Sequence, residues 1–332
     1  MKVGFLGLGS WGFCLAKLLS KKGFSVTGWS TNPELVQSLK QGKEHPYLKD
    51  QTLPADMKIT LDLNEAIEKA DCIVEAVTSA GLRNVFEQVK FFNKSPCPVV
   101  VTSKGIEQNS GLILPAVALE VLGESFLNHI GFLSGPSFAQ EVAKGLPTSV
   151  VGSGFRSETS KFVCDLFTTL TFRVYPNNDI NGVAYGGALK NIIAIACGIC
   201  EGLGFGFSSR AALMTRGLHE IRKLAEAQGC KKETIYGLSG MGDLCLTCSS
   251  MMSRNYRFGY LLAQGKTPEM AHREIEMVVE GSYTCVSTLQ LSQKLNIPMP
   301  ITETVYKIIY KNLNPKDAVR LLMERAIKEE HL

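Results

Sequence analysis

Residues 2–12 read Lys2-Val-Gly-Phe-Leu-Gly7-Leu-Gly9-Ser-Trp-Gly12, and this stretch decides the fold of the chain. A short apolar run, typical of a buried strand, leads into a G-x-G-x-x-G pattern that a helical pattern follows. Gly7 permits a tight turn, Gly9 lets backbone amides approach a pyrophosphate, and Gly12 lets the helix pack against the sheet. Free N–H groups at the start of that helix favour bound negative charge. The stretch therefore predicts a βαβ unit that binds a dinucleotide.

Short apolar runs continue to alternate with helical patterns as far as about residue 178. Most of the runs are continuously apolar, as strands buried on both faces should be. The expected strands are Lys2–Gly7, Ser25–Trp29, Cys72–Ala76, Val99–Thr102, Ile130–Leu133, Ser149–Gly152 and Thr171–Val174. The expected helices include Gly12–Lys22, Pro33–Gln41, Leu82–Phe92 and Pro115–Leu122. This alternation predicts an α/β fold, a Rossmann-like and mostly parallel sheet with helices on both faces.

The pattern changes after Pro176-Asn-Asn-Asp179, where long helical stretches begin and continue to the end of the chain. They include Asn181–Cys200, Ser209–Gln228, Arg254–Ala263, Cys285–Leu295 and Glu303–Lys311. We therefore expect two domains: a dinucleotide-binding domain over 1–178 and an all-helical substrate and catalytic domain over 179–332.

The composition excludes several classes of protein. A net charge of +4 without a Lys/Arg-rich run argues against a nucleic-acid partner. The longest apolar stretch, Ile192–Cys200, is about half of the roughly 18 residues that a membrane span needs. The N-terminal apolar run is broken by glycines and by Lys17, so we do not interpret it as a signal peptide. A cytoplasmic protein is expected, with its ten cysteines serving as small core residues.

Two further patterns look like known sites but do not have the required spacing. The pairs Cys197/Cys200 and Cys245/Cys248 lie too far apart for a zinc ribbon, and no histidine is close to them. Gln264-Gly-Lys-Thr267 resembles the end of a phosphate-binding loop, but Gly259 is one residue too far upstream and no strand precedes it. We interpret the cysteines as packing residues and the second segment as a turn.

Lys190 is placed within the small and aliphatic residues of 181–200. Burial disfavours an ammonium ion, so such a lysine either meets a carboxylate or has a lowered pKa. The structural alternative is that its charged end reaches the surface from a core helix. From this segment alone both interpretations remain open.

Four other segments set charged or small polar residues among glycines. Lys104 follows a buried strand, at the sheet edge where ligands bind in open α/β folds. Ser137 follows the next strand, where it serves a ligand, caps a helix, or does both. Asp243 lies in a glycine-rich loop, and Ser253-Arg-Asn255 offers phosphate donors at an expected helix start.

The end of the second strand bears on which dinucleotide is bound. An NAD-preferring site usually carries an acid there that bonds the ribose 2′-hydroxyl. The chain instead reads Trp29-Ser30-Thr-Asn32, with no acid before Glu34 and no adjacent arginine. Because nothing there repels a 2′-phosphate, we expect NADP to be preferred over NAD.

Taken together these motifs identify a family. From end to end the chain resembles bacterial glycerol-3-phosphate dehydrogenase, although Thr78 stands where that family often has proline. The resemblance rests on seven motifs in order: Gly7–Gly12, Ser103-Lys104-Gly105, Gly135-Pro136-Ser137-Phe138-Ala139, Ala188-Leu189-Lys190-Asn191, Gly240-Met241-Gly242-Asp243, Ser253-Arg254-Asn255 and Val278-Val279-Glu280-Gly281.

The resemblance implies reversible hydride transfer between NADP or NAD and dihydroxyacetone phosphate, giving sn-glycerol 3-phosphate for phospholipid synthesis. It makes Lys190 the general acid/base, Lys104 the group that orients the carbonyl, and Asp243 the partner that holds the ammonium. Burial and Lys104 should lower the pKa of Lys190, and Asp243 should oppose that shift.

The implied substrate contacts are Lys104, Gly135, Ser137, Lys190, Asp243, Ser253, Arg254 and Asn255. The implied cofactor contacts are Gly7, Gly9, Ser10, Trp11, Gly12, Ser30, Lys104, Ala139, Arg254, Val278 and Glu280. No metal is expected, and a homodimer is compatible with the pattern.

Two other functions compete with this one. A β-hydroxyacid dehydrogenase similar to 6-phosphogluconate dehydrogenase would share the layout, but Gly240–Asp243 and Ser253–Asn255 favour the glycerol phosphate branch. A regulatory protein that senses NADP(H) without turnover would have no need of an acid/base such as Lys190. A hydrolase is excluded because no G-x-S-x-G elbow is present.

Overall fold

The computed structural model describes residues 1–92, 95–327 and 329–330. It forms two compact units: Met1–Ser103 with Leu114–Val183, and Lys104–Ile113 with Ala184–Leu332. The division expected at residue 178 placed 104–113 in the first domain, whereas the structure groups them with the second unit. Hydrogen bonds explain this, because the Ile106 carbonyl accepts from Ser287 Oγ at 2.8 Å. The assignment of separate functions to the two domains remains a prediction.

Within the described residues, eight strands form one sheet in the first unit, in the order β3-β2-β1-β4-β5-β6-β7-β8. Every neighbouring pair is parallel except β6 and β7. The mostly parallel sheet is therefore confirmed. The strands are β1 (Lys2–Leu6), β2 (Ser25–Trp29), β3 (Lys58–Thr60), β4 (Cys72–Glu75), β5 (Val99–Val101), β6 (Ile130–Ser134), β7 (Thr148–Gly154) and β8 (Phe172–Asn177).

The edge strand β3 was not predicted from the sequence. It has three residues, one of them an exposed lysine, so it lacks the apolar run that marked the other strands. The remaining strands fall within a few residues of their expected positions.

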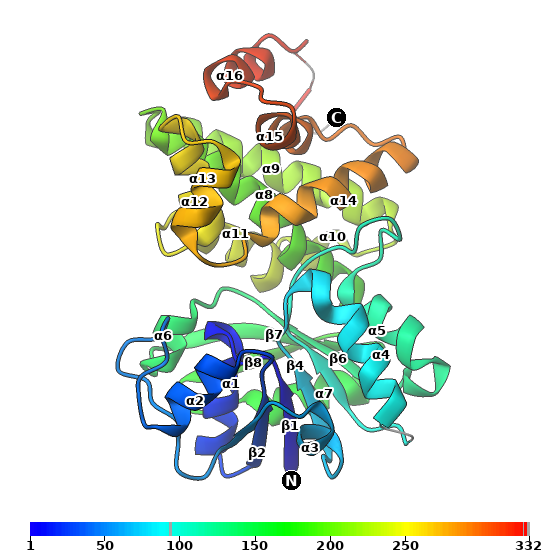
Figure 1. The fold of residues 1–332 in the computed structure, drawn as a ribbon. Coiled ribbons are helices and arrows are strands. Elements are labelled where there is room, and N and C mark those ends of the chain that lie inside the picture. The colour runs from blue at the N-terminus through cyan, green and yellow to red at the C-terminus, as the bar shows by residue number, and fades with distance from the viewer. Residues whose placement is uncertain (93–94, 328, 331–332) are drawn as a thin grey trace. The chain divides into compact units, whose positions relative to one another are not determined.

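Helices cover both faces of the sheet, as expected (Figure 1). Val3 and Phe5 of β1 point into a core shared with α1 (Ser10–Lys21) and α7 (Ser157–Phe167). Gly4 between them faces the opposite side, where a β-carbon would lie 2.6 Å from the Ala66 carbonyl oxygen of α3. The other helical segments of this unit are α2 (Pro33–Lys40), α3 (Leu63–Ile67), η1 (Ser79–Gly81), α4 (Leu82–Phe92), α5 (Leu114–Leu122), η2 (Glu124–Phe126) and α6 (Ala139–Ala143).

The regular elements of the second unit are helices, as the sequence predicts, and segment 104–113 adds an isolated β-bridge between Ile106 and Ile113. Its helices are α8 (Ile180–Gly202, whose first turn belongs to the first unit), α9 (Phe207–Ala227), α10 (Lys232–Ile235), the π-helical turn η3 (Leu238–Gly242), α11 (Asp243–Thr247), α12 (Arg254–Ala263), α13 (Pro268–Ile275), α14 (Glu280–Lys294), α15 (Pro300–Tyr310) and α16 (Pro315–Met323).

Helix α8 is the buried core of this unit. Its 23 residues are long and apolar enough to cross a membrane, which corrects the expectation that no stretch reaches that length. Its apolar window is nevertheless entirely buried inside the protein, so α8 is a core helix. Small residues permit this burial, because a β-carbon on Gly198 would lie 1.9 Å from the Tyr256 carbonyl oxygen of α12.

The two look-alike motifs have structural roles. In Gln264–Thr267, Gly265 adopts φ +85° after α12, and Thr267 caps α13 by accepting a hydrogen bond from the Met270 N–H. The segment is an interhelical turn. Cys197, Cys200 and Cys248 are buried and Cys245 is partly buried, in keeping with packing residues.

Glu75, at the end of β4, is a fully buried carboxylate that the sequence analysis did not single out. Its Oε1 accepts hydrogen bonds from Val77 N at 2.5 Å and from Ser103 Oγ at 2.7 Å. Oε2 has no hydrogen-bond partner among the residues that the structure describes. Burial raises the pKa of Glu75 to about 7, against the opposing effect of these hydrogen bonds.

Glu75→Gln should change how stability depends on pH. Folded Glu75 keeps its proton up to about pH 7, whereas the unfolded chain releases it near 4.5, so its contribution is lost as pH rises through this window. The total loss is on the order of 3 kcal/mol. Urea unfolding across this range should show a flatter pH dependence for Glu75→Gln than for wild type. Glu34→Gln, at an exposed glutamate, is the control, and parallel curves for wild type and Glu75→Gln would contradict the prediction.

Candidate active site

The glycine loop has the geometry that its sequence predicts. Gly7 adopts φ +99°, and a β-carbon there would lie 2.6 Å from the Ala76 carbonyl oxygen. A β-carbon at Gly12 would lie only 1.9 Å from the Gly7 carbonyl oxygen. Both positions therefore require glycine, because any side chain would collide with backbone.

Gly9, by contrast, is open on the side where a side chain would be. No atom among the described residues lies within 4 Å of the position of its β-carbon. Ser10 is the first residue of α1, and the buried Trp11 Nε1 has no hydrogen-bond partner among those residues. An open backbone at a helix start fits the phosphates of a dinucleotide.

The turn after β2 uses its polar side chains internally. Ser30 is buried, and its Oγ accepts a hydrogen bond from Asn32 N at 3.2 Å. Asn32 caps α2, because its Oδ1 accepts from Leu35 N at 3.0 Å. Neither side chain supplies a positive charge for a 2′-phosphate, so the NADP preference stays a prediction.

The segment after β6 departs from one expectation. Ser137 does not cap a helix: its Oγ donates to the Gly135 carbonyl at 3.1 Å, and Phe138 is the N-cap of α6. Ser137 lies two positions before Ala139, the first residue of α6, and its hydroxyl closes the preceding turn. Packing explains the glycine at position 135, because a β-carbon there would lie 2.7 Å from Val150 Cα in β7.

In the second unit three predicted residues meet. Asp243 Oδ2 accepts a hydrogen bond from Lys104 Nζ at 2.6 Å, and Asp243 Oδ1 accepts one from Lys190 Nζ. Asp243 is 1% exposed and Lys190 is 7% exposed. One buried carboxylate is therefore shared by two ammonium groups that lie 86 positions apart in the sequence.

The turn around Asp243 is built to bring the carboxylate to α8. The π-helical turn Leu238–Gly242 ends at Asp243, which begins α11. On α8, Gly186 faces that turn, and its β-carbon would lie 3.0 Å from Gly240 Cα. Lys190 lies four residues after Gly186, on the same face of α8. The glycines thus let the loop come close enough for Asp243 to reach the lysine.

The two ammonium groups and the one carboxylate determine the electrostatics of the site. One carboxylate neutralises one of the two ammonium groups, so the cluster carries an excess positive charge in a buried place. Burial lowers the pKa of Lys190 to about 8, Asp243 opposes that shift and Lys104 adds to it. This is the balance that the sequence predicts. Lys190 can therefore gain or lose a proton near neutral pH.

Thr247 completes the cluster and was missed as a site residue. Its Oγ1 donates to the Asp243 carbonyl at 2.6 Å and accepts from Lys190 Nζ at 2.7 Å. It lies four residues after Asp243 on α11, and that spacing could have revealed it. Of the three N–H groups on the Lys190 ammonium, these contacts use two, which leaves one for a substrate oxygen.

The Ser253–Asn255 segment starts a helix, as predicted, with Ser253 accepting a hydrogen bond from Tyr256 N. Arg254 Nη1 donates to the Val278 carbonyl at 2.9 Å, and the negative charge of Glu280 acts on the same guanidinium. Three of the predicted cofactor contacts, Arg254, Val278 and Glu280, are therefore neighbours within the second unit.

Asn255 is held by the protein itself. Its Nδ2 donates to Asn191 Oδ1 at 3.0 Å, and its Oδ1 accepts from Gly281 N at 2.8 Å. These bonds connect α8, α12 and α14 directly beside Lys190 and Glu280. A contact between Asn255 and the substrate remains a prediction, because its amide already has two protein partners.

Comparison with known proteins identifies the family. A family model described as the C-terminus of NAD-dependent glycerol-3-phosphate dehydrogenase matches residues 179–320, and the corresponding N-terminal model matches residues 2–159. A glycerol-3-phosphate dehydrogenase (NAD(P)+) of Protochlamydia amoebophila is 62% identical over 331 residues, covering 100% of this chain and 99% of the relative.

Solved structures agree with the family models. The glycerol-3-phosphate dehydrogenase of Coxiella burnetii superposes with a TM-score of 0.93 at 37% identity, over 98% of this chain and 99% of that one. The enzyme of Saccharomyces cerevisiae gives a TM-score of 0.80 at 28% identity, over 97% and 99%. These matches decide between the two dehydrogenase branches that the sequence left in competition. The chain belongs to the family of NAD-dependent glycerol-3-phosphate dehydrogenases, which are oxidoreductases.

Proposed function

We propose that the protein catalyses reversible hydride transfer between NADP or NAD and the C2 carbon of dihydroxyacetone phosphate, forming sn-glycerol 3-phosphate. The observation that carries this proposal is the buried cluster in which Lys104 and Lys190 share Asp243. The reduced nicotinamide supplies the hydride when the dinucleotide is bound by the Gly7–Gly12 loop. The family and the name of the Protochlamydia amoebophila relative support the substrate and the cofactor.

Lys190 transfers the proton in this reaction. As the C2 carbon of the ketone is reduced, its oxygen becomes an alkoxide that must take up a proton. The protonated Lys190 supplies it through the N–H not used by Asp243 and Thr247, and in the reverse reaction the neutral amine removes the hydroxyl proton. A pKa of about 8 makes both forms available near neutral pH. Lys104 orients and polarises the carbonyl.

The positive charge of the site selects a phosphorylated substrate. Lys104 and Lys190 exceed their shared carboxylate by one charge, which an anion compensates. Arg254 at the start of α12 adds a planar guanidinium that can bind a phosphate through two parallel hydrogen bonds. A neutral ketone such as dihydroxyacetone would not compensate the excess charge of the two lysines over Asp243.

Arg254→Lys should raise KM for dihydroxyacetone phosphate by about one to two orders of magnitude, because each hydrogen bond to a charged group contributes on the order of 1.5–3 kcal/mol and lysine cannot reproduce the fork. kcat should change less than KM. Steady-state kinetics measures both constants, and Arg257→Lys on the same helix is the matched control. An unchanged KM would place the phosphate site elsewhere.

The decisive assay follows the absorbance of NADPH or NADH as purified protein reduces dihydroxyacetone phosphate. We expect turnover with both cofactors and a higher kcat/KM with NADPH, since the Trp29–Asn32 turn holds no acid to repel a 2′-phosphate. A clearly higher value with NADH would contradict the preference. Tight cofactor binding without turnover would instead indicate a sensor of NADP(H).

Three properties extend the proposal beyond the site. The product is consumed in phospholipid synthesis, the protein acts in the cytoplasm, and it forms a homodimer. The burial of the apolar window of α8 supports the second of these, because this helix has no membrane-facing surface. Light scattering of the purified protein tests the third.

A further inference from the structure

A large cavity lies within the second unit, lined by residues that none of the catalytic proposals uses. Its volume is about 860 Å³, within the range of roughly 300–1,000 Å³ that small-molecule sites occupy. Helices α8, α9, α15 and α16 and residues 325–327 enclose it. Most of its lining is apolar, including the aliphatic residues Ile199, Leu213, Ile301, Val305, Ile308 and Leu322.

Three positively charged side chains lie among these apolar ones. Arg216, Lys223 and Arg325 line the cavity, and Glu220 is the only carboxylate among the described residues that do so. Arg216 and Lys223 lie seven residues apart on α9, which places them on one face, about 10 Å apart along the helix. The Arg216 Nη1 donates to the backbone carbonyl of Glu330, so the end of the described chain passes beside this cation.

Glu220 compensates at most one of these three cations: the charge of Arg325 acts on it, and its two oxygens also accept hydrogen bonds from another part of the unit. One of its oxygens accepts from Ile301 N at 2.6 Å, and the other accepts from Thr302 N and Thr302 Oγ1 at 3.2 and 3.1 Å. It thereby holds the N-terminus of α15, whose unpaired N–H groups need an acceptor. Burial raises the pKa of Glu220 to about 7, which reduces its negative charge further. An excess of positive charge is left for a ligand.

We propose that this cavity binds a long-chain fatty carboxylate, with the alkyl chain against the aliphatic lining and the carboxylate at Arg216, Lys223 and Arg325. An elongated apolar ligand with one anionic end satisfies both features of the lining. A neutral lipid would leave the excess positive charge of the lining uncompensated, and a small anion would leave the apolar volume unfilled.

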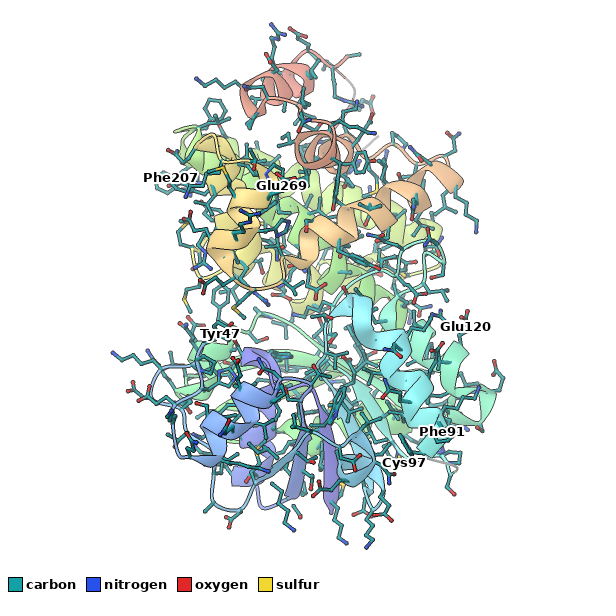
Figure 2. All side chains as sticks on the ribbon, viewed as in Figure 1. Tyr47, Phe91, Cys97, Glu120, Phe207 and Glu269 are labelled. Atoms are coloured by element: carbon teal, nitrogen blue, oxygen red, sulfur yellow. The ribbon has the colours of Figure 1, made fainter. Side chains whose placement is uncertain are left out.

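A second copy of the chain fits this surface less well. In a symmetric dimer the same patch meets itself, so the three cations of one copy would face those of the other. Exposed apolar side chains do occur at or next to the lining: Phe207, the neighbour in sequence of the lining residue Ser208, is 83% exposed (Figure 2), and the lining residue Met323 at the end of α16 is 80% exposed. They are suited to the entering alkyl chain, which carries no charge of its own.

Displacement of a fluorescent long-chain fatty acid by palmitate tests the proposal on the full-length protein. Palmitate should compete at a single site, and each methylene removed from the competitor should weaken binding by about three- to fourfold. The long-chain alcohol of the same length should bind at least tenfold more weakly than palmitate, because it cannot pair with the cations.

Two variants locate the site. Lys223→Glu combined with Arg325→Glu should weaken palmitate at least tenfold and leave the alcohol unaffected, and Leu213→Trp should weaken both by filling the cavity. Lys316→Glu, at an exposed lysine of α16 outside the lining, should change neither. Circular dichroism and urea unfolding report whether each variant is folded, and dehydrogenase turnover, which uses none of these residues, should stay at the wild-type level.

Three outcomes would overturn the proposal. They are equal affinity for palmitate and the alcohol, no effect of the charge reversal, and a stable dimer in light scattering that Leu213→Trp dissociates. The last would mean that a second copy covers the cavity. Because binding is read from fluorescence, a failure here leaves the proposed dehydrogenase reaction untouched, and a failure of that reaction leaves this test valid.

Discussion

Lys190→Ala is expected to lower kcat by about two to four orders of magnitude while the affinity for the dinucleotide stays close to that of wild type. The variant loses the group that exchanges a proton with the substrate oxygen, but the Gly7–Gly12 loop is unchanged. Steady-state kinetics in both directions, with cofactor binding measured by fluorescence, checks the two halves of the prediction. Near-normal turnover would remove Lys190 from the acid/base role.

Lys190→Arg tests whether the reaction needs the exchangeable proton of Lys190 or only its positive charge. An arginine keeps a cation beside Asp243 but does not release its proton at any working pH. If Lys190 serves as acid/base, this variant should be nearly as slow as Lys190→Ala. If its charge alone matters, much of the activity should return. Lys294→Ala, at an exposed lysine of α14, controls for the loss of a lysine as such.

The wild-type pH profile gives an independent readout of the same group. Oxidation of glycerol 3-phosphate needs neutral Lys190, so kcat/KM in that direction should rise with pH and level off above about 8. Reduction needs the protonated form and should decline above the same pH. Profiles with no inflection near this value would separate the catalytic proton from Lys190.

Asp243→Asn is expected to have the second large effect, through the pKa of Lys190. Asp243 is the carboxylate that favours the charged lysine, and an opposite charge at this distance shifts a pKa by roughly 1–3 units. Its removal should move the inflection of the pH profile to lower pH by a similar amount. Reduction at neutral pH should then slow by about two- to a hundredfold, because less Lys190 is protonated.

The same substitution should also destabilise the fold. Asp243 is 1% exposed and faces both Lys104 and Lys190, so asparagine would remove the negative charge that the buried Lys190 shares with the partly buried Lys104. Removing one partner of a buried ion pair typically costs about 3–5 kcal/mol, part of which Lys190 avoids by losing its proton. Denaturant unfolding measures the loss.

Thr247→Val is the matched control for Asp243→Asn. It removes a neutral hydrogen-bond acceptor from Lys190 and keeps the carboxylate. Its pH profile should keep an inflection near the wild-type value, with a smaller fall in stability. An equal shift in both variants would mean that hydrogen bonding, rather than charge, sets the pKa of Lys190.

Local pattern was enough for much of the fold. Continuously apolar runs located seven of the strands within a few residues, and the change of period after Pro176–Asp179 located the start of the helical part. The strand β3 escaped because three residues with an exposed lysine carry no periodic signal. Ser137 was wrongly expected as a possible helix cap, because a serine near a helix start has the same sequence signal whether it caps the helix or closes the turn before it.

The sequence pattern did not reveal which polar side chains are buried or which distant residues form hydrogen bonds with each other. Glu75 stands at the end of a β-rich run, and nothing in its neighbours reveals that Ser103 and the Val77 N–H enclose it. Segment 104–113 was assigned to the first domain because it follows β5 in the chain, whereas its hydrogen bonds lead to α14. Such contacts join residues far apart in sequence, and only the folded chain brings them together.

The sequence by itself determined the glycine loop, since the uses of Gly7 and Gly12 follow from local backbone geometry. It also named Lys104, Lys190 and Asp243, each from the unusual position of a charge among small residues. Only the tertiary structure decided that one carboxylate lies between the two lysines, that Thr247 joins them, and that burial brings the pKa of Lys190 to about 8. The reason is physical: a residue's type is local, but its pKa depends on desolvation and on neighbouring charges, which are set by the packing of the whole unit.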